Sequence, residues 1–214
     1  MEHAVSIDPI QSVNAITREV RTVEKDGKPA KVAVARRSYD TTPEDLWDAI
    51  TSAERIPRWF LPVTGELKLG GRYQLQGNAG GEITRCDAPR HLAVTWEMFG
   101  ETSWVDVRLE ERPDGTTHLE LEHAAHVDDA RWEQYGPGAV GVGWDLSLMG
   151  LELYLATGAP NDPKAAEAWL ATDDGRDFIG RSSDDWGRAS MASGTPPTSA
   201  TSAAERTTAF YTGA

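Results

Sequence analysis

A group of histidines and glutamates near residue 120 contains the side chains best suited to chemistry. His118, His123 and His126 alternate with Glu120 and Glu122, and imidazole and carboxylate groups are both zinc ligands. In a β-strand, however, successive side chains point to opposite faces. The two glutamates and His118 would therefore face outward and His123 inward. The helical HExxH pattern is also missing, so we expect no metal site.

His123 is then the one ionisable group predicted to point into an apolar interior. A polar group in such a place is a candidate ligand contact or acid/base group. The alternative is a surface histidine at a strand end. We treat His123 as a weak candidate for a catalytic residue.

Other catalytic signatures are missing. The glycine-rich segment Gly77–Gly81 is not followed by Lys-Ser/Thr and precedes a strand, which predicts a turn and not a phosphate loop. There is no GxSxG motif for a serine nucleophile. The single cysteine, Cys86, has no identifiable catalytic base beside it in the sequence to activate its thiol, and it is expected to be a small structural residue.

Composition excludes several classes of function. The chain has 214 residues and a formal net charge of −13, which disfavours binding to nucleic acid or to an anionic membrane. The N-terminal segment has neither the basic region nor the apolar region of a secretion signal. With one cysteine, the protein is expected to be cytoplasmic.

Alternating polarity and turn residues predict the first elements. Two strands are expected to flank the turn at Lys25–Pro29. Thr42 and Pro43 are suited to begin a helix, and Ser52 to cap a second helix that Pro57 interrupts. The expected strands are residues 15–24 and 30–39, and the expected helices begin at residue 43 and span residues 53–60.

From residue 65 to residue 125, turn signals recur about every ten residues, which is typical of an antiparallel meander. The expected strands are residues 66–69, 72–76, 82–86, 91–98, 102–111 and 116–124. Alternation assigns their inner face to Tyr73, Leu75, Leu92, Val94, Trp96, Met98, Val105, Val107, Leu109, Leu119, Leu121 and His123. It assigns the outer face to Arg108, Glu110, His118, Glu120 and Glu122.

The segment Val140–Leu155 predicts one long helix with two opposed apolar stripes. One stripe contains Trp144 and Leu148, and the other contains Val142 and Leu146. A membrane span is disfavoured because the run is shorter than about 20 residues and carries two carboxylates. We expect a helix buried on both sides, one against a curved sheet that leaves an apolar space at its mouth.

Beyond Gly158 the chain predicts short helices at residues 163–171, 183–192 and 203–211. We expect this tail to fold back and cover the second stripe of the long helix; a disordered tail is the alternative. The expected organisation is an N-terminal arm (1–14), a main domain (15–158) and a C-terminal helical extension (159–214).

Several segments resemble the family of activators of heat-shock protein 90 ATPase (AHSA-like). The main one is Arg37–Phe60, and the others are Gly70–Tyr73, Gly81–Ile83, Leu92–Trp96 and Thr116–Leu121. That family belongs to the START-like, or SRPBCC, helix-grip superfamily. The resemblance covers residues 15–158, and the tail resembles an extension seen in actinobacterial members.

The resemblance implies an α+β helix-grip fold (START-like or Bet v-like), in which a curved antiparallel sheet wraps around a long C-terminal helix. It also implies a cavity between the two that holds hydrophobic ligands. We expect the cavity to be lined by Trp59, Phe60, Tyr73, Trp96, Val107, Leu121, His123, Trp144 and Leu148.

We therefore expect a binding protein without a cofactor, whose partner is a hydrophobic small molecule or lipid. One alternative is a cyclase/aromatase-like or hydrolase-like enzyme that uses the same cavity. Another is a chaperone-ATPase activator or other protein-interaction module, with a protein partner or a homodimer. Nucleic-acid binding and membrane insertion are not expected.

Overall fold

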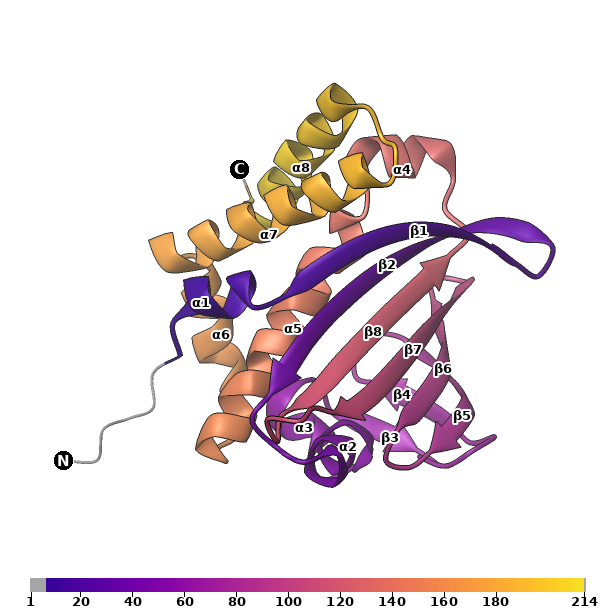
Figure 1. The fold of residues 1–214 in the computed structure, drawn as a ribbon, viewed down its shortest axis with the longest axis vertical. Helices are drawn as coiled ribbons and strands as arrows, with labels where there is room; N and C mark the ends of the chain where they lie inside the picture. The colour runs from indigo at the N-terminus through magenta and orange to yellow at the C-terminus, as the bar shows by residue number, and fades with distance from the viewer. Residues whose placement is uncertain (1–6, 214) are drawn as a thin grey trace. The chain divides into compact units, whose positions relative to one another are not determined.

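The computed structural model describes residues 7–213, which form two compact units. The helical unit contains described residues 7–21 and 127–213, and the sheet unit contains residues 22–126. Strand β1 begins in the first unit and ends in the second (Figure 1). The expected class, an α+β fold with a curved antiparallel sheet, a long helix and C-terminal helices, is confirmed.

The sheet has eight strands in the order β1-β2-β8-β7-β6-β5-β4-β3. From β2 across to β3, every neighbouring pair is antiparallel. The strands are β1 (Thr17–Lys25), β2 (Lys28–Tyr39), β3 (Val63–Gly65), β4 (Arg72–Leu75), β5 (Gly80–Asp87), β6 (His91–Met98), β7 (Glu101–Glu111) and β8 (Thr117–Ala125). The predicted meander is therefore confirmed.

One predicted strand, residues 66–69, is wrong. The strand that pairs with β4 is β3, which ends at Gly65. Beyond it the backbone N–H of Lys68 donates to the carbonyl of Glu66 at 2.9 Å, and that of Gly71 donates to the carbonyl of Lys68 at 2.8 Å. These local bonds close a turn, which alternating polarity alone does not reveal.

Two short helices follow β2 in the sheet unit, α2 (Pro43–Thr51) and α3 (Ile56–Trp59). The Thr42 hydroxyl accepts a hydrogen bond from the Asp45 N–H, so the predicted cap of α2 is confirmed. The second helix is shorter than predicted, because Ser52 ends α2 and does not cap α3. Pro57 lies in the first turn of α3, where a missing N–H costs nothing.

The hairpin between β6 and β7 contains an unusual residue, Phe99. Met98 pairs with Glu101, so Phe99 and Gly100 form a two-residue loop. Both have positive φ, 54° and 81°, as the type I′ turn requires. A phenylalanine is poorly suited to this conformation, and its side chain is 93% exposed.

The helical unit contains α1 (Pro9–Asn14), α4 (Asp129–Tyr135), α5 (Gly138–Thr157), α6 (Pro163–Leu170), α7 (Asp173–Ala192) and α8 (Pro197–Thr212). The sequence patterns did not predict α1 or α4, the second of which Asp128 caps. They also began α7 too late. Asp173, Asp174 and Gly175 were not recognised as its first turn, which Thr172 caps.

The tail packs back on α5, as predicted, but on a different side of the helix. A side chain at Gly141 would come within 2.3 Å of the Trp186 ring of α7, and one at Gly138 within 2.9 Å of Thr207 of α8. These glycines let the helices approach closely. These contacts lie on the side of α5 that carries Gly138, Gly141 and Asp145, and the neighbouring Val142 is fully buried.

At the centre of this contact lies a buried ion pair. The carboxylate of Asp145 on α5 is fully buried, and its Oδ2 accepts hydrogen bonds from Arg18 Nε (2.9 Å), Ser182 (2.5 Å) and Trp186 Nε1 (3.0 Å). The Arg18 guanidinium also pairs with Asp185 of α7 at 2.9 Å. Asp145 Oδ1 accepts no hydrogen bond from the described residues.

Helix α5 is longer than predicted. At 20 residues, Gly138–Thr157 is long and apolar enough to cross a membrane by length and composition, so the predicted shortness of the helix is wrong. Its charges remain informative. Asp145 is paired with Arg18, and Glu152 accepts a hydrogen bond from Ser12 of α1 at 2.7 Å. Both partners belong to the helical unit, and α5 is one of its core helices.

Replacing Phe99 with asparagine should stabilise the protein, because Asn tolerates positive φ and Phe does not. We expect the free energy of unfolding to rise by about 1 kcal/mol, measured by denaturant titration. Gly100→Ala, at the neighbouring position of positive φ, should lower it by a similar amount. A loss of stability in Phe99→Asn would show that the exposed ring makes a stabilising contact.

The Asp145 carboxyl gives a second prediction. Burial raises its pKa from 3.8 to about 6, against the opposing influence of Arg18. Folding then takes up a proton between about pH 4 and pH 6, so this group's contribution to the free energy of unfolding falls as the pH rises. The difference between wild type and Asp145→Asn should fall by up to about 3 kcal/mol over that range. A difference that grows with pH would show that Arg18 outweighs burial.

Candidate ligand-binding face of the sheet

The inner face of the sheet unit carries an apolar cluster. Its buried members are Ile56 of α3, Tyr73 and Leu75 of β4, and Ile83 of β5. Half-buried residues that pack against it are Phe60, Leu61, Val63, Leu67, Cys86, Leu92, Val94 and Trp96. The alternation of the sequence placed these β4 and β6 residues on one face, and their packing confirms that placement.

Strand β6 departs from the burial expected of an interior strand. It lies between β5 and β7, yet every residue in it is only half-buried. Leu92, Val94 and Trp96 are the three that point to the apolar cluster. Large apolar side chains inside a sheet are usually fully buried, so this face keeps apolar surface that is accessible to solvent.

Two aromatic residues continue this surface at the end of α3. The rings of Trp59 and Phe60 stack at a centroid distance of 5.4 Å, and both side chains are half-buried. The indole N–H of Trp59 donates to the carbonyl of Ala49 in α2 at 2.9 Å. The polar end of Trp59 is therefore occupied by the protein, and its ring is held in one orientation.

Tyr73 is anchored in a similar way. Its hydroxyl donates to the backbone carbonyl of Thr95 at 2.7 Å. Burial raises the pKa of this phenol above its ordinary value, so it stays neutral at physiological pH. The residue therefore presents an apolar ring and is not an acid or base.

His123 is buried, with 7% of its surface exposed, so the alternative of a surface histidine is wrong. It pairs in register with Val105 of β7 and shares the inner face with that residue. Its ring lies 6.0 Å from that of Trp96. Burial lowers the pKa of the imidazole from 6.5 to about 4, so it is neutral at pH 7.

Ser103 lies within hydrogen-bond distance of both the His123 ring and the Trp96 carbonyl. The Ser103 hydroxyl donates to the Trp96 carbonyl at 3.1 Å, and Ser103 Oγ lies 2.8 Å from His123 Nε2. With the serine proton on that carbonyl, the histidine tautomer that satisfies both contacts carries its proton on Nε2 and donates to Ser103. A serine nucleophile needs the opposite direction, with the histidine as acceptor. A pKa of about 4 also makes His123 a weak base at neutral pH.

The remaining predicted cavity residues divide between the two units. Val107 and Leu121 are 8% and 5% exposed and lie on the same inner face as His123. Trp144 is half-buried and Leu148 is 3% exposed, and both lie on α5 of the helical unit. Their place in a ligand site stays a prediction.

Two polar residues of the inner face, Ser103 and Arg37, were not predicted from the sequence. Ser103 was not recognised as the partner of His123, because pairing across strands fixes that contact. Arg37 pairs in register with Leu119, is 5% exposed, and lies 5.3 Å from the centroid of the Tyr39 ring. Two arginines occur in succession, at positions 36 and 37, so composition alone does not indicate which one points inward.

Replacing His123 with glutamine should change the pH dependence of stability in the opposite sense to Asp145→Asn. The lowered pKa means that unfolding takes up a proton between about pH 4 and pH 6.5, so this group's contribution to stability rises with pH. The difference between wild type and His123→Gln should rise by up to about 3 kcal/mol from pH 4 to pH 7. A flat difference would mean that His123 titrates normally and is reached by water.

Comparisons with known proteins agree with this architecture. Residues 40–156 match the family described as Activator of Hsp90 ATPase homolog 1-like protein. Comparison with curated proteins gave no match. The solution structure of CalU16 from Micromonospora echinospora is 32% identical, with a TM-score of 0.69, covering 84% of this chain and 97% of that one. Its crystal structure gives 30% and 0.66, covering 85% and 99%.

A crystal structure of an Hsp90 activator from Plasmodium falciparum shares the fold. It is 22% identical, with a TM-score of 0.50, and the match covers 61% of this chain and 99% of that one. The family match extends over more than half of the sequence, through α2, the sheet from β3 to β8, and most of α5. The chain therefore belongs to the Activator of Hsp90 ATPase homolog 1-like family, whose fold supports a ligand-binding or protein-interaction module.

Proposed function

We propose that the protein binds a hydrophobic small molecule or lipid on the inner face of its sheet. The observation that carries this proposal is the half-burial of Leu92, Val94 and Trp96 on an interior strand. The anchored rings of Trp59 and Tyr73 lie on α3 and β4 of the same unit. Their polar atoms bond to the backbone, so they offer a ligand apolar surface.

The expected affinity can be estimated from the apolar surface area that the ligand would cover. Covering about 300 Å² of apolar surface contributes roughly 7 kcal/mol. Part of this is lost because the ligand gives up translational and rotational freedom. We therefore expect a dissociation constant between about 10 μM and about 1 mM, with His123 and Ser103 as the polar contacts nearest to Trp96.

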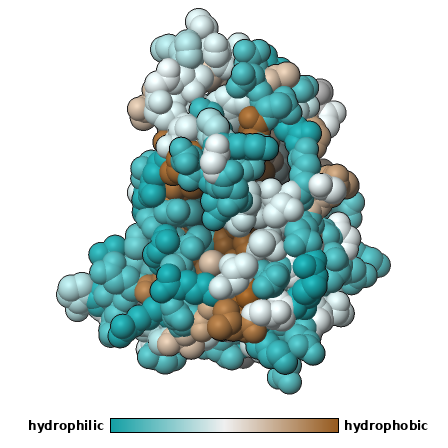
Figure 2. All heavy atoms as spheres, turned by 90° about the vertical axis from the view of Figure 1, so that its right-hand side faces the viewer, coloured by the Kyte–Doolittle hydropathy of each residue, from teal (hydrophilic) through white to brown (hydrophobic). Residues whose placement is uncertain are grey.

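Two alternatives receive less support. An enzyme that uses His123 for proton transfer would require a stronger base than this buried imidazole. A protein-interaction module would require a contiguous exposed patch. In the sheet unit the large exposed apolar residues are Val23, Leu69 and Phe99, which lie on β1 and in two separate turns. The face in Figure 2 is mostly hydrophilic, with small separate apolar areas.

The proposal is tested by displacement of a fluorescent fatty acid from the full chain. Val94→Arg should weaken binding at least tenfold, because it places a charge on the apolar face. Ala93→Arg is the matched control, since Ala93 precedes Val94 on β6 and pairs with Asp106 on the outer face. It should leave the affinity within about twofold of wild type.

A more conservative substitution at the same position controls for misfolding of Val94→Arg. Val94→Thr keeps the shape of the side chain and replaces one methyl group with a hydroxyl, so it should fold and still weaken binding severalfold. Circular dichroism establishes that each variant is folded. Unchanged probe affinity in both folded Val94 variants, or equal loss in Ala93→Arg, would refute binding on the inner face.

A further inference from the structure

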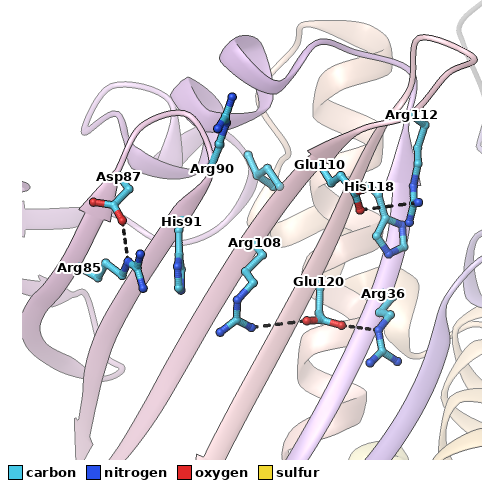
Figure 3. A pocket seen from close by; sticks show the side chains of 11 residues that line it. Arg36, Arg85, Asp87, Arg90, His91, Arg108, Glu110, Arg112, His118 and Glu120 are labelled. Atoms are coloured by element: carbon cyan, nitrogen blue, oxygen red, sulfur yellow. Dashed lines mark hydrogen bonds and ion pairs between the residues drawn. The ribbon is translucent and has the colours of Figure 1, made fainter.

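The outer face of the same sheet contains a hollow of about 750 Å³ rich in arginine. Arg36, Arg85, Arg90, Arg108 and Arg112 line it, on strands and turns that are distant in sequence (Figure 3). This volume is within the range of small-molecule sites, about 300–1,000 Å³. On a chain with a net charge of −13, such a concentration of arginine is unexpected.

Strand register builds the floor of the hollow. His91 pairs with Arg108, Arg108 with Glu120, and Glu120 with Arg36, which gives one straight row across β6, β7, β8 and β2. Side chains opposite one another in neighbouring strands share a face. Figure 3 shows Arg108 and Arg36 approaching Glu120 from its two sides.

The charges of this floor are matched. Arg108 lies 2.9 Å from Asp106 and 3.5 Å from Glu120, and Arg36 lies 2.5 Å from Glu120. His91 Nε2 is 2.8 Å from Asp106. These contacts hold the floor residues in place and account for their charges without a ligand.

The rim is different. Arg90 is the last residue of the turn between β5 and β6, and its side chain makes no hydrogen bond or ion pair within residues 7–213. Arg112 begins the turn between β7 and β8, and it forms an ion pair with Glu110 at 3.6 Å, a distance too long for a hydrogen bond. Arg85 uses only its Nε, on Asp87 at 2.6 Å.

The lining contains five arginines and three carboxylates, which are Asp87, Glu110 and Glu120. Arg108 also pairs with Asp106 and Glu122, which lie outside the lining, so the cationic excess belongs to the rim, at Arg90. His118 adds a neutral donor or acceptor, because burial and the charge of Arg112 lower its pKa. An outer face that only kept the sheet soluble would need neither this excess nor a hollow.

The turns that carry the rim are held in shape. Arg112 N–H donates to the Thr116 carbonyl at 2.8 Å, and Asp114 accepts from the Thr116 hydroxyl at 2.7 Å. On the other side, Arg90 N–H donates to the Asp87 carbonyl at 2.7 Å. The two guanidinium groups thus stand on ordered backbone, which limits the entropy lost when they bind an anion.

We propose that this hollow binds a small polyanion bearing phosphate or carboxylate groups, with Arg90 and Arg112 of the rim among its contacts. The planar guanidinium group matches both anions with paired hydrogen bonds. A nucleic-acid polymer is excluded, because the chain's overall negative charge would repel it beyond the hollow. The site lies on the opposite face of the sheet from the apolar site and does not depend on it.

The test is an NMR titration of the full chain with inorganic pyrophosphate and, separately, citrate. Sodium chloride keeps the ionic strength constant, so that general screening does not change. We expect saturable shifts of the arginine side-chain signals, and Arg90→Ala/Arg112→Ala should weaken binding at least tenfold. The tighter of the two anions identifies phosphate or carboxylate as the preferred group.

Arg72→Ala is the matched control. Arg72 is an exposed arginine of β4, paired with Glu97 and outside the hollow. Its loss should change the affinity less than twofold. Both positions altered in the double variant lie at turns, where substitution should be tolerated. If the double variant does not fold, the same titration is carried out on each single variant, Arg90→Ala and Arg112→Ala. The absence of saturable binding by either anion, or an equal loss in Arg72→Ala, would overturn the proposal.

Discussion

The register of the antiparallel sheet is the constraint on which both sites depend. Because side chains alternate between faces, the pairing of Val105 with His123 places the histidine inside, and the pairing of Arg108 with Glu120 places that ion pair outside. A slip of one residue would exchange the two faces. The apolar cluster that includes Ile83 and Val94 favours the observed register, since any other would expose it to water.

The two units each bury one titratable group, and burial acts on them in opposite directions. It raises the pKa of Asp145 to about 6 and lowers that of His123 to about 4. Between about pH 4 and pH 6 these contributions to stability nearly cancel. A flat stability profile of the wild-type protein would therefore conceal two strongly perturbed groups. Arg18, Ser182 and Trp186 hold the Asp145 carboxylate, so its burial is part of how the tail docks on α5.

The sequence predicted the strands well, because alternation and turn residues are local signals. The inner face was predicted down to Val94 and Trp96, and the cap of α2 at Thr42 was correct. What failed depends on tertiary contact. The side of α5 that receives the tail is determined by the fit of Trp186 on Gly141, which hydrophobicity does not reveal. The arginine hollow arises from residues between 36 and 120 that only register brings together.

The most direct test of ligand binding on the inner face is an isotope-filtered NMR experiment with a bound medium-chain fatty acid. Contacts between ligand protons and the methyl groups of Leu92, Val94 and Ile83 are predicted, because these side chains surround the accessible apolar surface. Methyl groups on the outer face, such as that of Ala93, should show none. Ligand contacts confined to residues outside this cluster, or no contacts at saturating ligand, would contradict the account.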